Sequence, residues 1–532
     1  MVVNSPLKHP KLDNGFRDAN PMAGFYLESF LKRHGFDARS VFDWSDDQSL
    51  EVALSTDPVA IALSTTYITD NALLEACLST IRRVAPDVPV VVGGPYIWKQ
   101  KIEYARDSGA SYRRRVEAKQ FGVDLLMDCL FGCSSFGCLG EAVYIAHEFG
   151  EYTLLRVLRA LAEGKRRGEA LSEIPNLVLP TPDGAWHHTP TAAEPVDLEE
   201  DFTRWELVEE MPSMVPIRSS VGCPYRCRYC DFIELHPAVR MRSAESIVRE
   251  VESAKRRSAR FFGFIDDNIF LSKRRIRELT TAFTENSLGV TWGGFFRVDR
   301  IDESNIEDLA LSGCRFGLCG IESLDDEQLV RLRKNCEREE VVRGVELATS
   351  AGMNVNLSLL VGFPGETKRS IDQTIDHINC LSSGHKGFAS WLAYPLYVLP
   401  GTAVDEIAYR RQFGLVGRRN TWRHETMSGE EAGTFWSNYL HDSIDQLPYH
   451  YYAGDVPSYW SPGRRQRGFT ARRDLTRCFV RGLSDEQVQC AFQRLYEEVR
   501  DSSKPIAAPS WQDVFAERQM QPGMRDRYRG AF

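Results

Sequence analysis

Two series of alternating strand-like and helix-like segments run through most of the 532-residue chain. In the first series, short apolar runs alternate with helical patterns over residues 22–34 and 71–84. Parallel strands joined by helices require this order, so the sequence predicts an α/β sheet covered by helices on both faces. The strands expected here are Val2–Asn4, Val59–Ser64, Val88–Val92 and Val123–Met127.

The second series begins after a stretch over residues 174–202 that is rich in Pro, Thr and acidic residues. Six further strand-like runs alternate with helical patterns, which predicts an incomplete (β/α)6 barrel of the TIM type. In that architecture, functional residues lie at the carboxyl ends of the strands. The six expected strands are Ile217–Val221, Phe261–Ile265, Thr291–Val298, Arg315–Ile321, Asn354–Val361 and Ser390–Val398. Beyond about residue 405 the alternation stops, and we expect a mixed, mainly helical region.

The net charge and the distribution of apolar residues argue against several classes of protein. A net charge of −9 argues against nucleic acid as a partner. The first ten residues lack the apolar run of a signal peptide, and no apolar stretch is long enough to cross a membrane. We therefore expect a cytoplasmic protein. In that compartment, thirteen cysteines favour metal binding or buried thiols over disulfides.

Three cysteines, Cys223, Cys227 and Cys230, stand on one short segment directly after an expected strand. Three thiolates can ligate three irons of a 4Fe–4S cubane, which leaves the fourth iron open to a bidentate small molecule. Zinc is the alternative, but it requires a fourth ligand, and the nearest histidine, His236, is not at a usual spacing. The sequence therefore predicts an iron–sulfur cluster with an open iron.

The CxxxCxΦC pattern, in which Tyr229 is the aromatic residue, resembles the radical S-adenosylmethionine (SAM) superfamily. Segments at the ends of the later strands are similar to that family as well, so the resemblance covers most of residues 212–405. These segments are residues 264–268, 292–299, 320–323, 361–367 and 397–402. The resemblance implies reductive cleavage of SAM to a 5′-deoxyadenosyl radical, with flavodoxin or ferredoxin as electron donor.

Several residues at these strand ends suit the chemical groups of SAM. Carboxylates suit its ammonium and ribose hydroxyls, which makes Asp266 and Glu322 candidates, and Arg297 suits its carboxylate. Gly362 would allow backbone to approach the adenine closely, and Tyr229 belongs to the cluster motif itself. For Asp266 the alternative is helix capping, a common role of Asp.

In the first series, Gly93-Gly94-Pro95 follows one expected strand and Ser64-Thr65-Thr66 follows another. Ahead of a radical SAM-like core, this arrangement resembles the flavodoxin-like, Rossmann-type cobalamin-binding domain of the class B radical SAM methyltransferases. Small residues at strand ends would let a corrin ring approach, although Gly pairs there are often tight turns. The Asp-x-His-x-x-Gly motif of many cobalamin domains is absent, so no cobalt ligand is assigned.

Two other groups of residues leave alternatives open. Cys129, Cys133 and Cys138 could hold a second cluster, but their spacing fits no known pattern and favours unliganded thiols. In the tail, His424 is a candidate acid or base. The nearby aromatic residues are more often packing than recognition; they are Tyr449, Tyr451, Tyr452, Tyr459 and Trp460.

The resemblance implies four parts: a cobalamin-binding-like domain (1–165), a linker (166–211), a radical SAM core (212–405) and a substrate-covering region (406–532). The expected activity is a cobalamin-dependent radical SAM methyltransferase that uses methylcobalamin. It would methylate an unactivated carbon, or a phosphinate phosphorus, of a small-molecule or peptide natural-product intermediate. The alternative keeps both cofactors but catalyses a rearrangement, cyclisation or oxidation. A tRNA methylthiotransferase and a non-enzymatic cobalamin sensor are less favoured.

Overall fold

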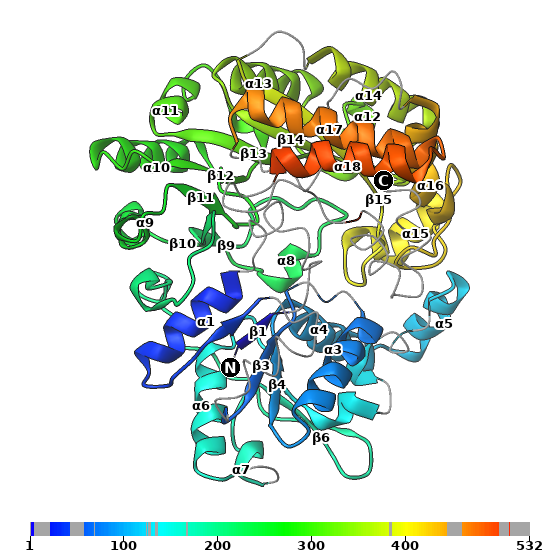
Figure 1. Cartoon of the computed structure of the whole chain (residues 1–532). Helices are drawn as coiled ribbons and strands as arrows, with labels where there is room; N and C mark the ends of the chain where they lie inside the picture. Colours follow the sequence, from blue (N-terminus) through cyan, green and yellow to red (C-terminus); the bar gives the residue numbers. More distant parts are fainter. Residues whose placement is uncertain are drawn as a thin grey trace.

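The chain forms two α/β sheets that lie one above the other in the computed structural model (Figure 1). The structure describes residues 2–4, 22–42, 58–66, 68, 70–123, 125, 129–132, 137–165, 169–381, 386–443, 460–499 and 510. Within these ranges, none of the helices has the length and apolar character needed to cross a membrane.

The first sheet has seven strands in the order β2-β1-β3-β4-β5-β6-β7. The first five run parallel, and the order 2-1-3-4-5 is that of flavodoxin-like sheets. Its strands are β1 Val2–Asn4, β2 Ser40–Val41, β3 Ile61–Ser64, β4 Val90–Gly93, β5 Val143–Ile145, β6 Leu177–Pro180 and β7 Trp186–His188. Its helices are α1 Met22–Arg33, α3 Asn71–Val84, α4 Pro95–Ser108, α5 Tyr112–Gln120, α6 Glu151–Ala162 and α7 Glu169–Ser172.

Alternation along each strand sends side chains to two separate cores, as a doubly covered sheet requires. Ile61 and Leu63 of β3 pack with α3 and α4, whereas Ala62 between them packs with α1 and α6. The predicted fourth parallel strand over 123–127 was wrong. Val123 and Leu125 belong to no strand, and the other residues of that run lie outside the described ranges. The sheet instead uses Val143–Ile145, a run too short to stand out in sequence.

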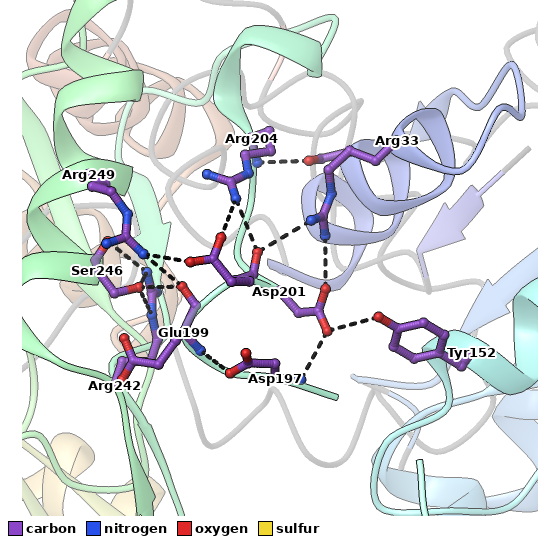
Figure 2. A network of polar contacts seen from close by, with 11 residues as sticks. Arg33, Tyr152, Asp197, Glu199, Asp201, Arg204, Arg242, Ser246 and Arg249 are labelled. Atoms are coloured by element: carbon purple, nitrogen blue, oxygen red, sulfur yellow. Dashed lines mark hydrogen bonds and ion pairs between the residues drawn. The ribbon is translucent and has the colours of Figure 1, made fainter. Parts of the chain in front are cut away.

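The segment expected to be a linker is structured and contacts both halves of the molecule. Strands β6 and β7 extend the first sheet antiparallel to β5. Farther on, Asp201 accepts hydrogen bonds from Arg33 of α1 at 3.3 Å and Tyr152 of α6 at 3.2 Å (Figure 2). Two residues earlier, the carbonyl of Glu199 accepts from Arg249 of α9 (Ala244–Arg256) at 3.1 Å. This polar network joins the helices of the first sheet to those of the second.

The second sheet has six parallel strands in the order β15-β14-β13-β12-β11-β8, which confirms the predicted parallel βα series. Its strands are β8 Val215–Ile217, β11 Phe261–Phe264, β12 Thr291–Phe295, β13 Cys314–Glu322, β14 Asn354–Val361 and β15 Phe388–Pro395. The helices in this part are α8 Phe232–Leu235, α9, α10 Lys273–Glu285, α11 Ile306–Leu311, α12 Asp326–Leu332, α13 Arg338–Ser350 and α14 Lys368–Leu381. One continuous core fills the space between strands and helices.

The predicted first strand, Ile217–Val221, is divided. β8 ends at Ile217, and Ser220–Val221 forms a separate strand, β9, which pairs antiparallel with β10 (Arg240–Met241). The chain therefore bends between the two strands, at Arg218 and Ser219, just before the cysteine segment.

The C-terminal region contacts both ends of the second sheet, whereas the sequence predicts that it covers the carboxyl end. It contains α15 Ile407–Phe413, α16 Gly429–Ser443, α17 Pro462–Val480 and α18 Asp485–Val499. Trp422 and α16 pack at the carboxyl end of β14. In contrast, Arg465 of α17 donates to Asn356 near the amino end of β14 at 2.8 Å. Phe469 stacks on Phe388, the first residue of β15.

Candidate functional site

The three cysteines lie on the loop between β9 and α8. Its first residue, Gly222, has a φ of +82°, and a Cβ there would lie 2.7 Å from the carbonyl oxygen of Ala238. The Gly222 amide donates to Oδ2 of Asp267 at 3.1 Å, just beyond the end of β11. Within the cysteine segment, the Arg228 amide donates to the carbonyl of Leu332 at 3.0 Å. The loop is therefore fixed against the end of β11 and the end of helix α12.

The electrostatics of the three thiols favour a bound cation. Burial raises the pKa of Cys230 to about 12, and the negative charges of Cys227 and Asp231 act in the same direction. Burial and the charge of Cys227 also raise the pKa of Cys223. Three neighbouring thiolates therefore require a strong local positive charge, which the irons of a cluster provide. The residues fit a cluster with three protein ligands.

Among the residues that the structure describes, no group of three or more His, Cys, Asp or Glu side chains is arranged to hold a single metal ion. A cubane makes a different geometric demand, because each of its protein ligands binds a separate iron.

Two of the predicted SAM contacts, Tyr229 and Glu322, bind each other. The Tyr229 hydroxyl donates to Oε1 of Glu322 at 2.7 Å, and Lys334 Nζ donates to the same oxygen at 3.3 Å. Burial lowers the pKa of Lys334, but the charge of Glu322 and that of Cys227 raise it, and the net shift is upward. Oε2 of Glu322 has no hydrogen-bond donor within the described part of the chain, so one oxygen is left for a ligand.

Arg297 is held in place while one of its nitrogens stays unpaired. Its Nε and one Nη bind the two carboxylate oxygens of Asp299, each at 3.0 Å. The guanidinium lies 4.1 Å from the ring centre of Tyr225, which belongs to the cysteine loop. Nη1 is buried and has no hydrogen-bond partner among the described residues. A fixed, buried donor beside the cysteine loop suits a ligand carboxylate.

Asp266, a predicted contact of SAM, already accepts three hydrogen bonds within the protein. Its carboxylate accepts from the Ser219 amide at 3.1 Å, the Ser219 hydroxyl at 2.8 Å and the Ser220 hydroxyl at 2.5 Å. These bonds hold the bend between β8 and β9. The capping alternative does not apply, because the next helix, α10, is capped by Ser272.

Gly362 and His424 meet, but not around a ligand. A Cβ at Gly362, where φ is +92°, would collide with the indole of Trp422. The close approach that glycine permits here is thus to Trp422. The His424 ring interacts through Nε2 with the Gly362 carbonyl at 2.9 Å, and Nδ1 accepts from the Thr426 amide at 3.3 Å. Both ring nitrogens are engaged within the protein, and the role of His424 as an acid or base stays a prediction.

A cleft lies between the carboxyl ends of the two sheets and contains about 1400 Å³ of space free of protein atoms, part of it open to solvent. On the first sheet it is lined by Ser64 and Thr66 after β3 and by Gly93, Gly94 and Pro95 after β4. On the second sheet it is lined by residues 265–267 and by His236 after α8. The cleft thus brings the predicted corrin-contact residues opposite the strand end that holds the cysteine loop.

Thr65 is the exception among these residues, because it does not line the cleft. Its amide and its hydroxyl both donate to the Gly93 carbonyl, at 2.9 and 3.0 Å. Gly94 has a φ of +115°, and a Cβ there would lie 2.9 Å from the Thr65 hydroxyl oxygen. Thr65 therefore joins the ends of β3 and β4, and Gly94 permits that close contact.

A direct bridge connects the two candidate cofactor sites. α4, which starts at Pro95, packs against α8, which starts two residues after Cys230. The Trp98 indole donates to the Leu235 carbonyl at 3.1 Å. Lys99 Nζ lies 3.1 Å from Glu234 and 3.5 Å from Asp231. Figure 1 shows α8 between the two sheets.

The second cysteine group shows ordinary contacts of buried thiols. Cys129 Sγ donates to the Gln100 carbonyl at 3.3 Å, and burial raises its pKa to about 12. Cys138 Sγ accepts from the Ser79 hydroxyl at 3.4 Å. Cys133 lies outside the described residues, as do the four tail tyrosines from 449 to 459.

Sequence reasoning missed several polar residues of the site. Lys334 pairs with Glu322, and the short helix α12 lies between them in the chain. The signal in the sequence was a lysine just after a short helix that itself follows a strand. The sequence indicates no role for His236 except in the zinc alternative. It lines the cleft and interacts through Nδ1 with Glu148 at 2.9 Å. Arg218 and Glu151 also line the cleft and carried no motif.

Comparison with known proteins supports the predicted resemblance. Residues 217–378 match the Radical SAM superfamily. An uncharacterized methyltransferase of Pyrococcus horikoshii is 24% identical over 34% of this chain and 39% of its own length. An anaerobic magnesium-protoporphyrin IX monomethyl ester cyclase of Rubrivivax gelatinosus is 24% identical over 66% of this chain and 60% of its own length. The chain thus spans less than two thirds of these relatives.

A solved structure shares the fold over most of the chain. It is that of the radical SAM methyltransferase TsrM from Kitasatospora setae with cobalamin and a 4Fe–4S cluster bound. The match has a TM-score of 0.55 and 20% identity, and it covers 78% of this chain and 75% of TsrM. The match over residues 217–378 shows that the chain carries a radical SAM domain, and the solved structure shows that its fold is shared with TsrM.

Proposed function

We propose that this protein is a cobalamin-dependent radical SAM methyltransferase. Its substrate would be a small-molecule or peptide natural-product intermediate, methylated at an unactivated carbon or a phosphinate phosphorus. The observation that carries the proposal is the cleft between the two sheets, which is lined by Gly93–Pro95 on one side and by residues next to the cysteine loop on the other. Ligands of open α/β sheets bind at the carboxyl ends of the strands.

In this proposal Cys223, Cys227 and Cys230 hold a 4Fe–4S cluster, and SAM binds at its open iron. Arg297 Nη1 receives the SAM carboxylate and Glu322 Oε2 its ammonium, since both atoms lack a partner within the described residues. When bound, the cluster supplies the electron for reductive cleavage of SAM, which a flavodoxin or ferredoxin would deliver. The protein's own contribution is to orient SAM and to exclude water.

The corrin would lie in the cleft against Ser64, Thr66 and Gly93–Pro95. Small side chains at both strand ends admit a broad, flat ring, and the two hydroxyls can bond its amide groups. When bound, methylcobalamin supplies the transferred methyl group. The fold shared with TsrM, which was solved with cobalamin, supports this assignment.

The sheet topology moves the proposed end of the cobalamin-binding domain. Because β6 and β7 belong to the first sheet, the cobalamin-binding domain extends from residue 1 to His188 rather than to residue 165. The radical SAM core keeps its proposed span of 212–405.

The direct test is the absorption spectrum of protein produced anaerobically with cobalamin, combined with an iron count. We expect corrin bands beside a broad iron–sulfur shoulder and about four irons per chain. Iron–sulfur absorption alone, after cobalamin supply, would remove the corrin from the proposal. About eight irons would instead revive a second cluster at the cysteines of the first sheet.

The second candidate function is a rearrangement, cyclisation or oxidation without methyl transfer. The similarity to the cyclase of Rubrivivax gelatinosus, which extends over 370 residues, favours it. SAM labelled in its methyl group separates the two functions once a substrate is found. Label in the product supports the methyltransferase, whereas 5′-deoxyadenosine formed with an unlabelled product supports the alternative.

A further inference from the structure

Three polar side chains gather on the wall of the cleft nearest the outer helices of the first sheet. Tyr26 comes from α1, Glu151 is the first residue of α6, and Arg218 lies in the bend between β8 and β9. The surrounding wall is apolar, with Ala62 and Val91 from the strands of the first sheet. Polar groups in such a setting require partners.

Glu151 is buried, with 6% of its surface exposed, and its Oε2 has no hydrogen-bond partner among the described residues. An acidic residue at the start of a helix often caps the free amides there. In α6, Glu194 of the connecting segment does this, accepting from the Tyr152 amide at 2.9 Å and the Thr153 amide at 3.2 Å. The Glu151 carboxyl interacts with its own amide, but it does not cap the next two amides of the helix.

Tyr26 and Arg218 also lack hydrogen-bond partners among the described residues. The Tyr26 hydroxyl is buried and has no hydrogen-bond partner among the described residues, but it lies close enough to Glu151 to lower the pKa of that carboxyl. The Arg218 guanidinium lies 5.3 Å from the ring centre of Tyr26 and 5.8 Å from that of Phe149. Within the described part of the chain, its nitrogens form no hydrogen bond and no ion pair. Burial raises the pKa of Glu151, and the nearby charge of Arg218 lowers it by a smaller amount.

We propose that Glu151, Tyr26 and Arg218 bind a primary carboxamide at the edge of the corrin ring. Oε2 of Glu151 accepts an N–H of the amide, while the Tyr26 hydroxyl and the Arg218 guanidinium donate to its carbonyl oxygen. A carboxamide carries donor and acceptor a few ångströms apart, which matches an acceptor facing two donors. This inference rests on the proposed cobalamin-binding function.

Other ligand groups match the triad less well. A phosphate would suit Arg218 but would be repelled by Glu151, and an isolated ammonium would have the opposite conflict. A neutral amide satisfies both residues without bringing a further charge into an apolar wall.

The first experiment changes the ligand. Binding of hydroxocobalamin and of its monocarboxylic acids, in which one side-chain amide is replaced by a carboxylate, is measured by absorbance titration. We expect one monoacid to bind the wild type about tenfold more weakly, because its carboxylate faces Glu151. In Glu151→Gln that penalty falls to about threefold or less. The inference is overturned if no monoacid is disfavoured, or if the penalty is equal in both proteins.

The second experiment changes the protein. Tyr26→Phe is compared with Tyr152→Phe, whose hydroxyl binds Asp201 and does not line the cleft. We expect about fivefold weaker cobalamin binding for Tyr26→Phe and no change for the control, at equal iron content in both. Equal affinities of the two variants would overturn the inference while leaving the proposed function intact. Failure of the wild type to bind cobalamin at all would instead overturn the proposed function and the inference with it.

Discussion

The two sheets share one βα plan but finish their strands in opposite ways. In the first sheet, β3 and β4 end in Ser64 and Gly93, small residues that line an open cleft. In the second, β13 ends in Glu322 and β11 is followed by Asp266, carboxylates that already accept hydrogen bonds from neighbouring side chains. The strand ends of the first sheet leave space for a ligand, and we call them the open edge. The strand ends of the second sheet hold carboxylates in position, and we call them the fixed edge.

This difference matches two different demands on a binding edge. A large flat ligand requires space and a few peripheral polar contacts, so small residues are sufficient. A cluster and a small charged ligand require groups held in position before binding, which buried hydrogen-bond networks provide. The same architecture can therefore serve two kinds of ligand through its strand ends alone.

The largest expected effect is on the cysteine loop. Cys227→Ala removes one of the three proposed cluster ligands, and we expect loss of iron and of SAM cleavage while cobalamin binding to the first sheet remains. Iron analysis and corrin absorbance of the same sample measure both. Cys129→Ala is the control and keeps its iron. If corrin binding disappears together with iron, the two edges are not independent and the comparison fails.

The next effect concerns the fixed edge. Lys334→Met leaves Glu322 buried without its cation, and we expect a loss of about 3 kcal/mol in the free energy of unfolding. Adding Glu322→Gln to this variant restores part of the loss, because the uncompensated charge is removed. Urea denaturation of the anaerobic holoprotein measures both. A single variant as stable as the wild type would show that the pair does not fix this edge.

The open edge is tested at Gly94. Gly94→Ala places a Cβ against Thr65 at a φ of +115°, and we expect about 1–2 kcal/mol of destabilisation. We also expect weaker cobalamin binding, since the Gly93–Pro95 turn must shift. Gly164→Ala has a similar backbone cost at a φ of +81°, but its Cβ meets nothing within 4 Å. Equal cobalamin affinity of the two variants would contradict a role of this turn in the cleft.

A further expected effect is a pH dependence of stability at the fixed edge. Burial raises the pKa of Glu366, which accepts from the Gly362 amide, to about 8 from the ordinary value of 4.5. Between these two values the folded protein holds a proton that the unfolded chain has lost, so rising pH favours unfolding. We expect Tm to fall less in Glu366→Gln than in the wild type between about pH 5 and pH 8. If Tm falls equally with pH in both proteins, the pH dependence comes from a group other than Glu366.

The sequence predicts best where a local rule decides the structure. The turn after Val90–Gly93 follows from a short apolar strand and two glycines. The position of the cysteines after a strand follows from the βα alternation. In contrast, Val143–Ile145 was missed because three residues carry too little periodicity to distinguish a strand from a loop.

The site residues were harder to predict because their roles depend on distant partners. Glu322 looks like a free ligand in sequence, but α12 returns the chain so that Lys334 pairs with it. Asp266 looks equally available until the bend at Ser219 brings two serines onto its carboxylate. Gly362 was expected to admit a ligand, and a tryptophan sixty residues later occupies that approach. Such long-range pairings leave no local trace in the sequence.

The polar network of the connecting segment has a consequence for protein engineering. Asp201 is bound to helices of the first sheet, and Glu199, two residues away, is bound to α9 of the second (Figure 2). A hybrid enzyme that joins this first sheet to a relative's barrel would break the network if the chains were fused in this segment. The better junction lies after α9, so that Glu199 stays with Arg249 and Lys99 stays with its partners Asp231 and Glu234. The unit to transplant is therefore larger than the sheet itself and includes the cysteine loop.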